Sequence, residues 1–166
     1  MPLTAPSDID ALAARLGAAL AGHGWLCATA ESCTGGLVAG AITAIAGSSA
    51  WFDRGFVTYS NEAKFAMLGV APSMLDAHGA VSEPIARAMV AGALSASRAQ
   101  VAVAVTGIAG PGGATPGKPV GTVCFGWGAR DQPPRAVTHH LAGDRAAVRS
   151  TSVVIALEGL LALASR

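Results

Sequence analysis

The chain contains only two lysines, Lys64 and Lys118, against nine arginines. A buried lysine can lose its proton and act as a base, whereas the guanidinium of arginine stays protonated in proteins. Lys64 follows the hydroxyl-bearing residues Thr58, Tyr59 and Ser60, a setting in which a neutral amine can activate a serine nucleophile. Because most lysines are simply solvated, this pattern alone leaves open both a catalytic lysine and an ordinary surface lysine.

Composition limits the classes of protein to which the chain can belong. It has 166 residues, a net charge of +1, 52% hydrophobic and 13% charged residues, and a mean hydropathy of +0.49. This length fits a single domain over residues 1–166. The apolar excess predicts more buried surface than a monomer needs, so we expect a homo-oligomer, a dimer or larger. With no basic stripe and only 5% aromatic residues, no nucleic-acid partner is expected.

Nothing in the sequence predicts export or membrane insertion. Residues 1–10 lack the basic segment and apolar core of a secretory signal. The stretch 33–52 carries no charge and approaches the length of a membrane span, but its glycines and serines predict a buried helix that ends near Gly47. The three cysteines form no Cys-x-x-Cys motif, and so fit neither a disulfide framework nor a zinc knuckle. We therefore expect a cytoplasmic protein without a membrane segment.

Hydrophobic periodicity predicts strands that alternate with helices. Strands are expected at residues 25–30, 55–60, 100–106, 120–127 and 135–141. One helix is expected to follow Gly36 and run to Ala46; the others begin at the caps Ser7, Asn61, Ser82 and Asp144. The alternation predicts an α/β fold, a three-layer α/β/α sandwich with a mostly parallel sheet. The tight loop 131–134 predicts antiparallel pairing at one end of that sheet.

Three loops rich in glycine and hydroxyls each follow a predicted strand, at residues 31–36, 59–61 and 106–113. In sheets of this kind ligands bind at the carboxyl ends of the strands, so we expect the three loops to converge. The first loop opens a helix, where free backbone N–H groups favour a phosphate or a developing oxyanion. Its other interpretation is an ordinary capped turn.

Neither a nucleotide fold nor a metal explains these loops. Residues 112–118 match the glycine and lysine spacing of a P-loop, but Pro119 replaces the hydroxyl that would hold Mg²⁺ and a strand follows in place of a helix. No Gly-x-Gly-x-x-Gly follows the first strand, so no nicotinamide cofactor is implied. The histidines at 23, 78, 139 and 140 offer no pair on one helix face, and we expect no metal and no cofactor. Since the three loops contain no histidine, a Ser-Lys pair is the remaining hydrolytic option.

Several linked motifs resemble the CinA C-terminal family, in the form that lacks an amino-terminal domain. In order and spacing they are AESCTGG (30–36), AGSS (46–49), YSNEAK (59–64), HGAVS (78–82), GIAGP (107–111) and KPVGT (118–122). The resemblance covers nearly the whole chain. It implies hydrolysis of the carboxamide of nicotinamide mononucleotide to nicotinate mononucleotide and ammonia, without a metal, in pyridine-nucleotide recycling. One departure is that residues 112–117 lack the acidic residue often found there, which affects loop contacts and not chemistry.

The resemblance also implies which residues form the site. Ser49 is expected to be the nucleophile and Lys64 the base, with Ser32 and Ser48 as alternative nucleophiles and Tyr59 as a second proton donor to ammonia. The residues expected to contact the substrate are Thr34, Gly35, Gly36, Ser48, Asn61, Thr106, Gly110, Gly112 and Arg145.

Each substrate group has an expected partner. Backbone N–H groups near Ser48 and Ser49 or in the turn 34–36 are expected to form the oxyanion hole, and the loop 110–113 with Arg145 is expected to hold the phosphate. Lys118 is at most a further phosphate contact. Two other functions stay open at this point: a catalytically silent nucleotide-binding or regulatory module, and a serine amidase acting on another small amide.

Overall fold

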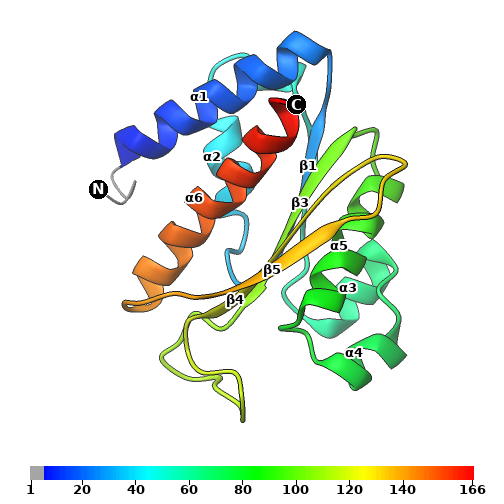
Figure 1. Cartoon of the computed structure of the whole chain (residues 1–166), viewed down its shortest axis with the longest axis vertical. Helices are drawn as coiled ribbons and strands as arrows, with labels where there is room; N and C mark the ends of the chain where they lie inside the picture. The colour runs from blue at the N-terminus through cyan, green and yellow to red at the C-terminus, as the bar shows by residue number, and fades with distance from the viewer. Residues whose placement is uncertain (1–5) are drawn as a thin grey trace.

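The computed structural model describes residues 6–166, which form helices packed on both faces of one sheet (Figure 1). The sheet has the order β2-β1-β3-β4-β5. Its strands are β1 (Cys27–Glu31), β2 (Phe52–Val57), β3 (Val101–Gly107), β4 (Thr122–Ala129) and β5 (Arg135–His140). β1 is parallel to β2 and β3, while β4 is antiparallel to β3 and β5. Four of the five strands therefore run in one direction, which confirms the predicted mostly parallel sheet and its antiparallel end.

The helices make the outer two layers of the sandwich (Figure 1). On one face lie α1 (Pro6–His23), α2 (Leu37–Thr43) and α6 (Arg145–Ala164), and on the other α3 (Asn61–Leu68), α4 (Pro72–His78) and α5 (Glu83–Ser95). A short 3₁₀ helix, η1 (Ser48–Ala50), precedes β2. The predicted three-layer α/β/α architecture is confirmed.

The central strand β3 explains how the two cores differ. Val101, Val103 and Val105 face the core shared with α1 and α6, while Ala102 and Ala104 face the core shared with α5. Successive side chains of a strand point to opposite faces, so the Val-Ala alternation gives one bulky face and one that a helix can approach closely. Both faces are buried, as is typical of a central strand between two helical layers.

The carboxyl ends of three parallel strands meet at one edge of the sheet. Glu31, the last residue of β1, pairs with Val57 of β2 and with Val105 of β3. The residues that follow, Ser32 and Thr58 among them, therefore start their loops side by side. The predicted convergence of the three loops rests on this register.

Several element boundaries differ from the sequence-based prediction. The cap of α3 is Ser60, whose side chain accepts a hydrogen bond from the Ala63 N–H at 3.0 Å, and not Asn61, which begins the helix. β2 starts and ends three residues earlier than expected, because the chain turns toward α3 after Thr58. α2 ends at Thr43 and not at 46, α4 was not predicted, and α1 begins one residue before the expected cap Ser7.

The longest helix, α6, can be compared with a membrane-spanning segment. By length and composition α6 is apolar enough to cross a membrane, but half of its most apolar window is buried and it packs on β3, β4 and α1. This is the pattern of a core helix in a folded domain.

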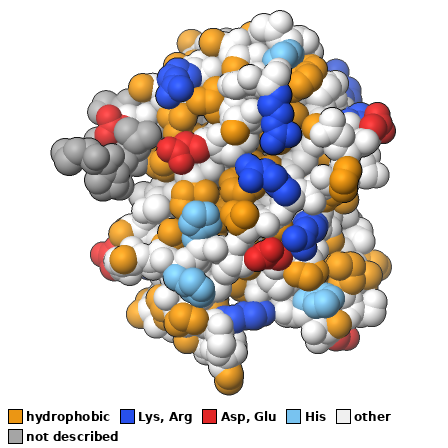
Figure 2. Space-filling view, in the orientation of Figure 1, with side chains coloured by type: hydrophobic (Ala, Val, Ile, Leu, Met, Phe, Trp, Pro, Cys, Tyr) orange, Lys and Arg blue, Asp and Glu red, His pale blue; other side chains and the backbone are white. Residues whose placement is uncertain are grey.

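On the face in Figure 2, basic side chains are interspersed with acidic, histidine and hydrophobic ones.

Candidate functional site

Lys64 and Ser32 meet at the carboxyl edge of the sheet. The Lys64 ammonium nitrogen, Nζ, lies 3.0 Å from the Ser32 hydroxyl oxygen and donates to the Thr58 carbonyl at 2.8 Å. Ser32 comes directly after β1, and Lys64 lies in the first turn of α3, which Ser60 caps. In its neutral form the amine can still donate to Thr58 while its lone pair accepts the Ser32 proton. The geometry therefore fits a serine with its base.

The surroundings of Lys64 favour the neutral amine. Its side chain is among the largest that are fully buried, and the residue is 1% exposed. Burial disfavours the charged form and lowers the pKa of Lys64 below the ordinary 10.5, while the neighbouring Cys33 acts in the opposite sense and more weakly. The ion pairs among the described residues join Asp53 to Arg54 and Arg98, and Glu83 to Arg87, so none of them neutralises Lys64.

Cys33 is adjacent to Ser32 but is a poor nucleophile. Burial raises the pKa of its thiol to about 11, partly offset by hydrogen bonding and by the charge of Arg149. The thiolate is the reactive form of cysteine, so at neutral pH the sulfur remains protonated. The hydroxyl of Ser32, and not the thiol of Cys33, is therefore the reactive group of this turn.

A cavity of about 220 Å³ opens beside the pair. It is lined by Ser32, Cys33, Tyr59, Asn61, Lys64, Ala80, Val81, Thr106, Gly107, Ala109 and Arg145. The Thr106 hydroxyl donates to the Ala80 carbonyl at 2.8 Å and ties the segment before α5 to the end of β3. Of the residues expected to contact the substrate, the structure brings Asn61, Thr106 and Arg145 to this cavity.

Arg145 and Tyr59 form the rim of the cavity on the side of α6. One guanidinium nitrogen of Arg145 donates to the Tyr59 hydroxyl at 3.1 Å and another to the Gly110 carbonyl at 2.8 Å. Because the tyrosine oxygen accepts this bond, its own proton is free to be donated elsewhere. Both side chains are exposed, so they face the solvent end of the cavity.

A second cavity of about 700 Å³ adjoins the first and shares Ala109 and Arg145 with it. It is also lined by Arg149, a residue that sequence reasoning missed. The signal that could have found it is its position, one helical turn beyond Arg145 and therefore on the same face of α6. Asp144 also lines this cavity, so the two arginines leave it with a net positive charge, as an anionic group requires.

The turn after β1 differs from the expected anion site. Both carboxylate oxygens of Glu31 accept backbone N–H groups of the first turn of α2, from Val38 at 2.8 Å and Ala39 at 3.0 Å. A side chain thus already occupies the N–H groups of Val38 and Ala39 at this helix N-terminus, where a phosphate or a developing oxyanion was expected. Gly35 and Gly36 have left-handed φ angles of +58° and +105°, which few other residues adopt, so the structure supports a conformational role for these two glycines.

Ser49 lies away from the lysine. It is exposed in η1, ahead of β2, and the start of β2 pairs with Cys27 at the amino end of β1. Five strand residues separate that end from Ser32, roughly 17 Å along the sheet. This corrects the sequence-based placement of Ser49 beside Lys64, and the same position removes Ser48 from the cavity. The similarity of the AGSS motif to a family pattern carried no information about which end of the sheet it occupies.

The other residues that were expected to contact the substrate lie in different environments, some buried and some exposed. Thr34 is fully buried, and its hydroxyl is one of three buried side-chain groups in the described part of the chain that have no hydrogen-bond partner. Gly110 has a left-handed φ of +84°, and a Cβ atom there would clash with the Val120 side chain, so backbone conformation and packing explain this glycine. Gly112 is exposed with open space around it. Lys118 donates to the His78 carbonyl at 3.0 Å, outside both cavities.

Metal-ligating residues do not gather at this site. Within the described residues no three His, Cys, Asp or Glu side chains are placed to hold a metal ion. The reactive side chains that line the cavity include a serine, a buried amine, a tyrosine and an arginine.

Comparison with known proteins gives this geometry a context. Residues 9–164 match the sequence pattern described as the CinA C-terminal domain. The chain is 54% identical over 150 residues to "Nicotinamide-nucleotide amidohydrolase PncC" of Enterobacter agglomerans, covering 90% of this chain and 92% of that protein. It is also 55% identical over 159 residues to a "Putative competence-damage inducible protein" of Symbiobacterium thermophilum. That match covers 91% of this chain but only 37% of the longer protein.

A solved structure agrees with the fold. The crystal structure of the competence/damage inducible protein CihA from Agrobacterium tumefaciens matches with a TM-score of 0.88 and 51% sequence identity, over 93% of this chain and 94% of that one. At this identity and coverage the likeness extends to the whole α/β/α sandwich.

Proposed function

Since the chain belongs to the CinA C-terminal domain family, we propose that it is a nicotinamide-nucleotide amidohydrolase that releases ammonia from nicotinamide mononucleotide. The observation that carries the proposal is the buried Lys64 amine, 3.0 Å from the Ser32 hydroxyl in a cavity at the strand ends. Relatives that bear this activity in their names, matched over nearly their full length, support the choice of substrate.

Ser32 is the nucleophile of this proposal and Lys64 its base. The Ser32 oxygen attacks the carboxamide carbon while its proton passes to the Lys64 amine, and the carbonyl oxygen takes up the negative charge. When the intermediate collapses, the amide nitrogen receives a proton from Lys64, either directly or through Tyr59, which Lys64 then reprotonates, and leaves as ammonia. This leaves an ester on Ser32, which a water molecule then attacks with Lys64 again as base. The products are nicotinate mononucleotide and free enzyme.

The oxyanion that forms in both steps needs hydrogen-bond donors. The backbone amides of Cys33 and Thr34, which follow Ser32 directly, have the position that serves this purpose in many serine hydrolases. We do not assign this role to the amides near Ser49, the other group considered from sequence, because they lie at the amino end of the sheet.

The substrate phosphate lies in the adjoining cavity of this proposal. Arg145 borders both cavities, so a mononucleotide with its amide at Ser32 can place its phosphate beside this guanidinium. Arginine binds phosphate through two donors. The loop at Gly110 contributes by holding Arg145 through its carbonyl.

The setting of the enzyme is a further part of the proposal. The three buried free cysteines support a reducing cytoplasm, and a role in pyridine-nucleotide recycling follows from the reaction. The exposed large hydrophobic side chains support a homo-oligomer, which sedimentation can test; they are Leu37, Val57, Tyr59, Phe65, Met67 and Val120.

Ammonia release separates this function from its two competitors. The purified protein should convert nicotinamide mononucleotide to nicotinate mononucleotide with one ammonia per turnover, and should turn over nicotinamide riboside, which lacks the phosphate, less efficiently. Calorimetric binding of the mononucleotide without turnover would instead identify a silent module. Equal efficiency with and without the phosphate would identify a serine amidase of another small amide.

A further inference from the structure

Arg149 connects α6 to the turn that carries Ser32. Its Nε atom donates to the Cys33 carbonyl at 3.2 Å, and an Nη atom donates to the Thr34 carbonyl at 3.4 Å. The arginine is half-buried and lies more than a hundred residues from the turn in sequence. Two consecutive carbonyls of the nucleophile turn are thus held by one planar guanidinium.

The position of these carbonyls sets the direction of the amides in the same peptide units. In a trans peptide the C=O and the N–H point in opposite directions. The Cys33 carbonyl points to Arg149, so the Thr34 N–H points away from it. The next peptide shows the same arrangement, because its carbonyl at Thr34 is bound to Arg149 while its N–H at Gly35 donates to the Ser32 carbonyl at 3.0 Å. The Gly35 N–H is therefore bonded to the backbone carbonyl of Ser32, while the Thr34 N–H points away from Arg149.

The rest of the turn is held at its two ends. The Ser32 N–H donates to the Val105 carbonyl of β3 at 2.9 Å, and the Leu37 N–H donates to the Thr34 carbonyl at 3.0 Å. Among the described residues, Arg149 is the donor that reaches the Cys33 carbonyl. At Gly35 a Cβ atom would stand 3.4 Å from the guanidinium, an ordinary contact distance, so the arginine lies directly against the turn.

We propose that Arg149 is a positioning residue, which fixes the turn so that the Thr34 N–H meets the oxygen that gains charge when Ser32 attacks. As the Ser32 oxygen bonds to the carbonyl carbon of the substrate, the π electron pair of that carbonyl moves onto the carbonyl oxygen, and the serine proton moves to Lys64. The proposal rests on the proposed function only in taking Ser32 as the nucleophile. It does not depend on which amide is the substrate.

Lysine cannot replace arginine in this role. The guanidinium presents donors in a fixed planar fork, whereas an ammonium is a single point at the end of a flexible chain. Arg149→Lys keeps the positive charge beside the second cavity but loses one of the two carbonyl contacts. Because removal of an oxyanion donor costs about a hundredfold or more in rate, we expect a partly misdirected donor to lower kcat by roughly tenfold to a hundredfold with a much smaller change in KM.

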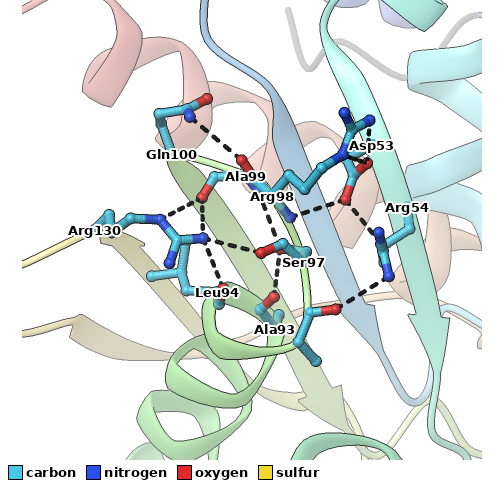
Figure 3. A network of polar contacts seen from close by, with 10 residues as sticks. Asp53, Arg54, Ala93, Leu94, Ser97, Arg98, Ala99, Gln100 and Arg130 are labelled. Atoms are coloured by element: carbon cyan, nitrogen blue, oxygen red, sulfur yellow. Dashed lines mark hydrogen bonds and ion pairs between the residues drawn. The ribbon is translucent and has the colours of Figure 1, made fainter.

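Arg130 provides a matched control. Its guanidinium also holds backbone carbonyls, those of Leu94, Ser97 and Ala99 at 2.7–3.1 Å (Figure 3). These groups precede β3, and so lie at the opposite end of the sheet from Ser32. Arg130→Lys should lower the midpoint of denaturant unfolding and leave kcat unchanged, whereas Arg149→Lys should lower kcat at temperatures where both variants are folded.

Steady-state kinetics with two substrates separate the possible roles of Arg149. A loss in kcat by the same factor for nicotinamide mononucleotide and nicotinamide riboside supports positioning. A rise in KM confined to the phosphorylated substrate, with kcat intact, would overturn the proposal in favour of a phosphate contact. Unchanged kinetics in a less stable variant would overturn it in favour of a purely structural role.

An ester substrate makes the test independent of the natural amide. Acylation of Ser32 by 4-nitrophenyl acetate also places charge on a carbonyl oxygen, and Ser32→Ala identifies the serine-dependent part of the nitrophenolate release. We expect Arg149→Lys to slow that part by a factor similar to its effect on kcat. If the wild-type protein reacts with the ester but releases no ammonia from the mononucleotide, the substrate assignment fails and the role of Arg149 can still be measured. If there is no serine-dependent reaction with either compound, both proposals fall.

Discussion

Lys64 and Ser32 are 32 residues apart in sequence, and their side chains meet at 3.0 Å because β1 and β2 run parallel and end together. β1 delivers the serine directly, while β2 is followed by a short capped turn that places the lysine in the first turn of α3. The lysine is buried by the same packing that brings it to the serine. One strand register therefore sets both the distance between the two groups and the acidity of the base.

Replacement of the two serines should distinguish their roles. Ser32→Ala removes the hydroxyl on Lys64 and should lower kcat by about ten thousandfold or more, as loss of a nucleophile does in serine hydrolases. Ser49→Ala changes an exposed side chain at the other end of the sheet and should leave kcat and KM unchanged. Ammonia release from nicotinamide mononucleotide measures both variants. An inactive Ser49→Ala protein with normal stability would contradict the placement of the nucleophile at Ser32.

The dependence of activity on pH should report the neutral form of Lys64. Because the base must be unprotonated, kcat/KM should rise as the pH passes the Lys64 pKa, and burial puts that rise below pH 10.5. Lys64→Arg keeps the charge but cannot lose the proton, so it should lower kcat by about a hundredfold or more. A kcat/KM profile that rises only above pH 10.5, or full activity in Lys64→Arg, would show that Lys64 is not the base.

The lowered pKa of Lys64 also determines whether the free energy of unfolding rises or falls with pH. The unfolded chain keeps the Lys64 proton up to about pH 10.5, whereas the folded protein gives it up at lower pH. Between the two values the unfolded state binds more protons, so this group makes the free energy of unfolding increase with pH. Denaturant titrations across that window should show a shallower rise for Lys64→Met than for the wild type.

The sequence predicted the architecture better than the site. The Val-Ala alternation of β3 predicted a strand buried between two helical layers, and the hydroxyl-rich strand ends predicted that the loops converge. Both are local patterns that directly affect how the chain packs. The predicted Lys64 base depended on the same local pattern, and as a proposal it now rests on the 3.0 Å distance between Lys64 and Ser32. The start of α3 at Ser60 was missed, since Ser60 and Asn61 are both suitable capping residues and only the geometry decides which side chain accepts the N–H group.

The choice of nucleophile could have used the order of the elements. Ser32 follows the predicted strand 25–30 and Ser49 precedes the predicted strand 55–60, so a parallel sheet already places them at opposite edges. The family motif, which carries no information about the edge, was followed instead. Arg149 was missed for a different reason. It contacts Cys33 and Thr34 from a helix more than a hundred residues away, and only a packed structure brings the two segments together.

Arg145 should govern recognition of the phosphate. Arg145→Met removes the guanidinium that borders both cavities, and loss of charge-assisted hydrogen bonds should raise KM for nicotinamide mononucleotide by roughly tenfold to a hundredfold. KM for nicotinamide riboside, which has no phosphate, should change little. Initial rates over a range of both substrates measure the difference. Equal KM changes for the two substrates would mean that Arg145 acts through Tyr59 or Gly110 and not on the phosphate.

Glu31 should support both the fold and the nucleophile. Its buried carboxylate accepts the N–H groups of Val38 and Ala39 at the start of α2, where a negative charge also interacts favourably with the helix dipole. In Glu31→Gln one oxygen is replaced by an NH₂ group that faces a donor, so we expect the free energy of unfolding to fall by about 1.5–3 kcal/mol. Because Ser32 follows directly, kcat should fall as well.

Asp53→Asn is the control that separates these two effects. The Asp53 side chain is 3% exposed and holds Arg54 and Arg98 at the amino end of the sheet (Figure 3). Hydrogen bonds, first that from the Arg98 backbone N–H, lower the pKa of Asp53 below 3.8, so its contribution to stability is present at neutral pH and lost as the pH falls through the folded value. Asp53→Asn should therefore be less stable at neutral pH, lose less stability on acidification, and keep the wild-type kcat. Equal loss of kcat in both variants at matched stability would show that Glu31 acts on activity only through general destabilisation, whereas a loss confined to Glu31→Gln places the effect at the nucleophile turn.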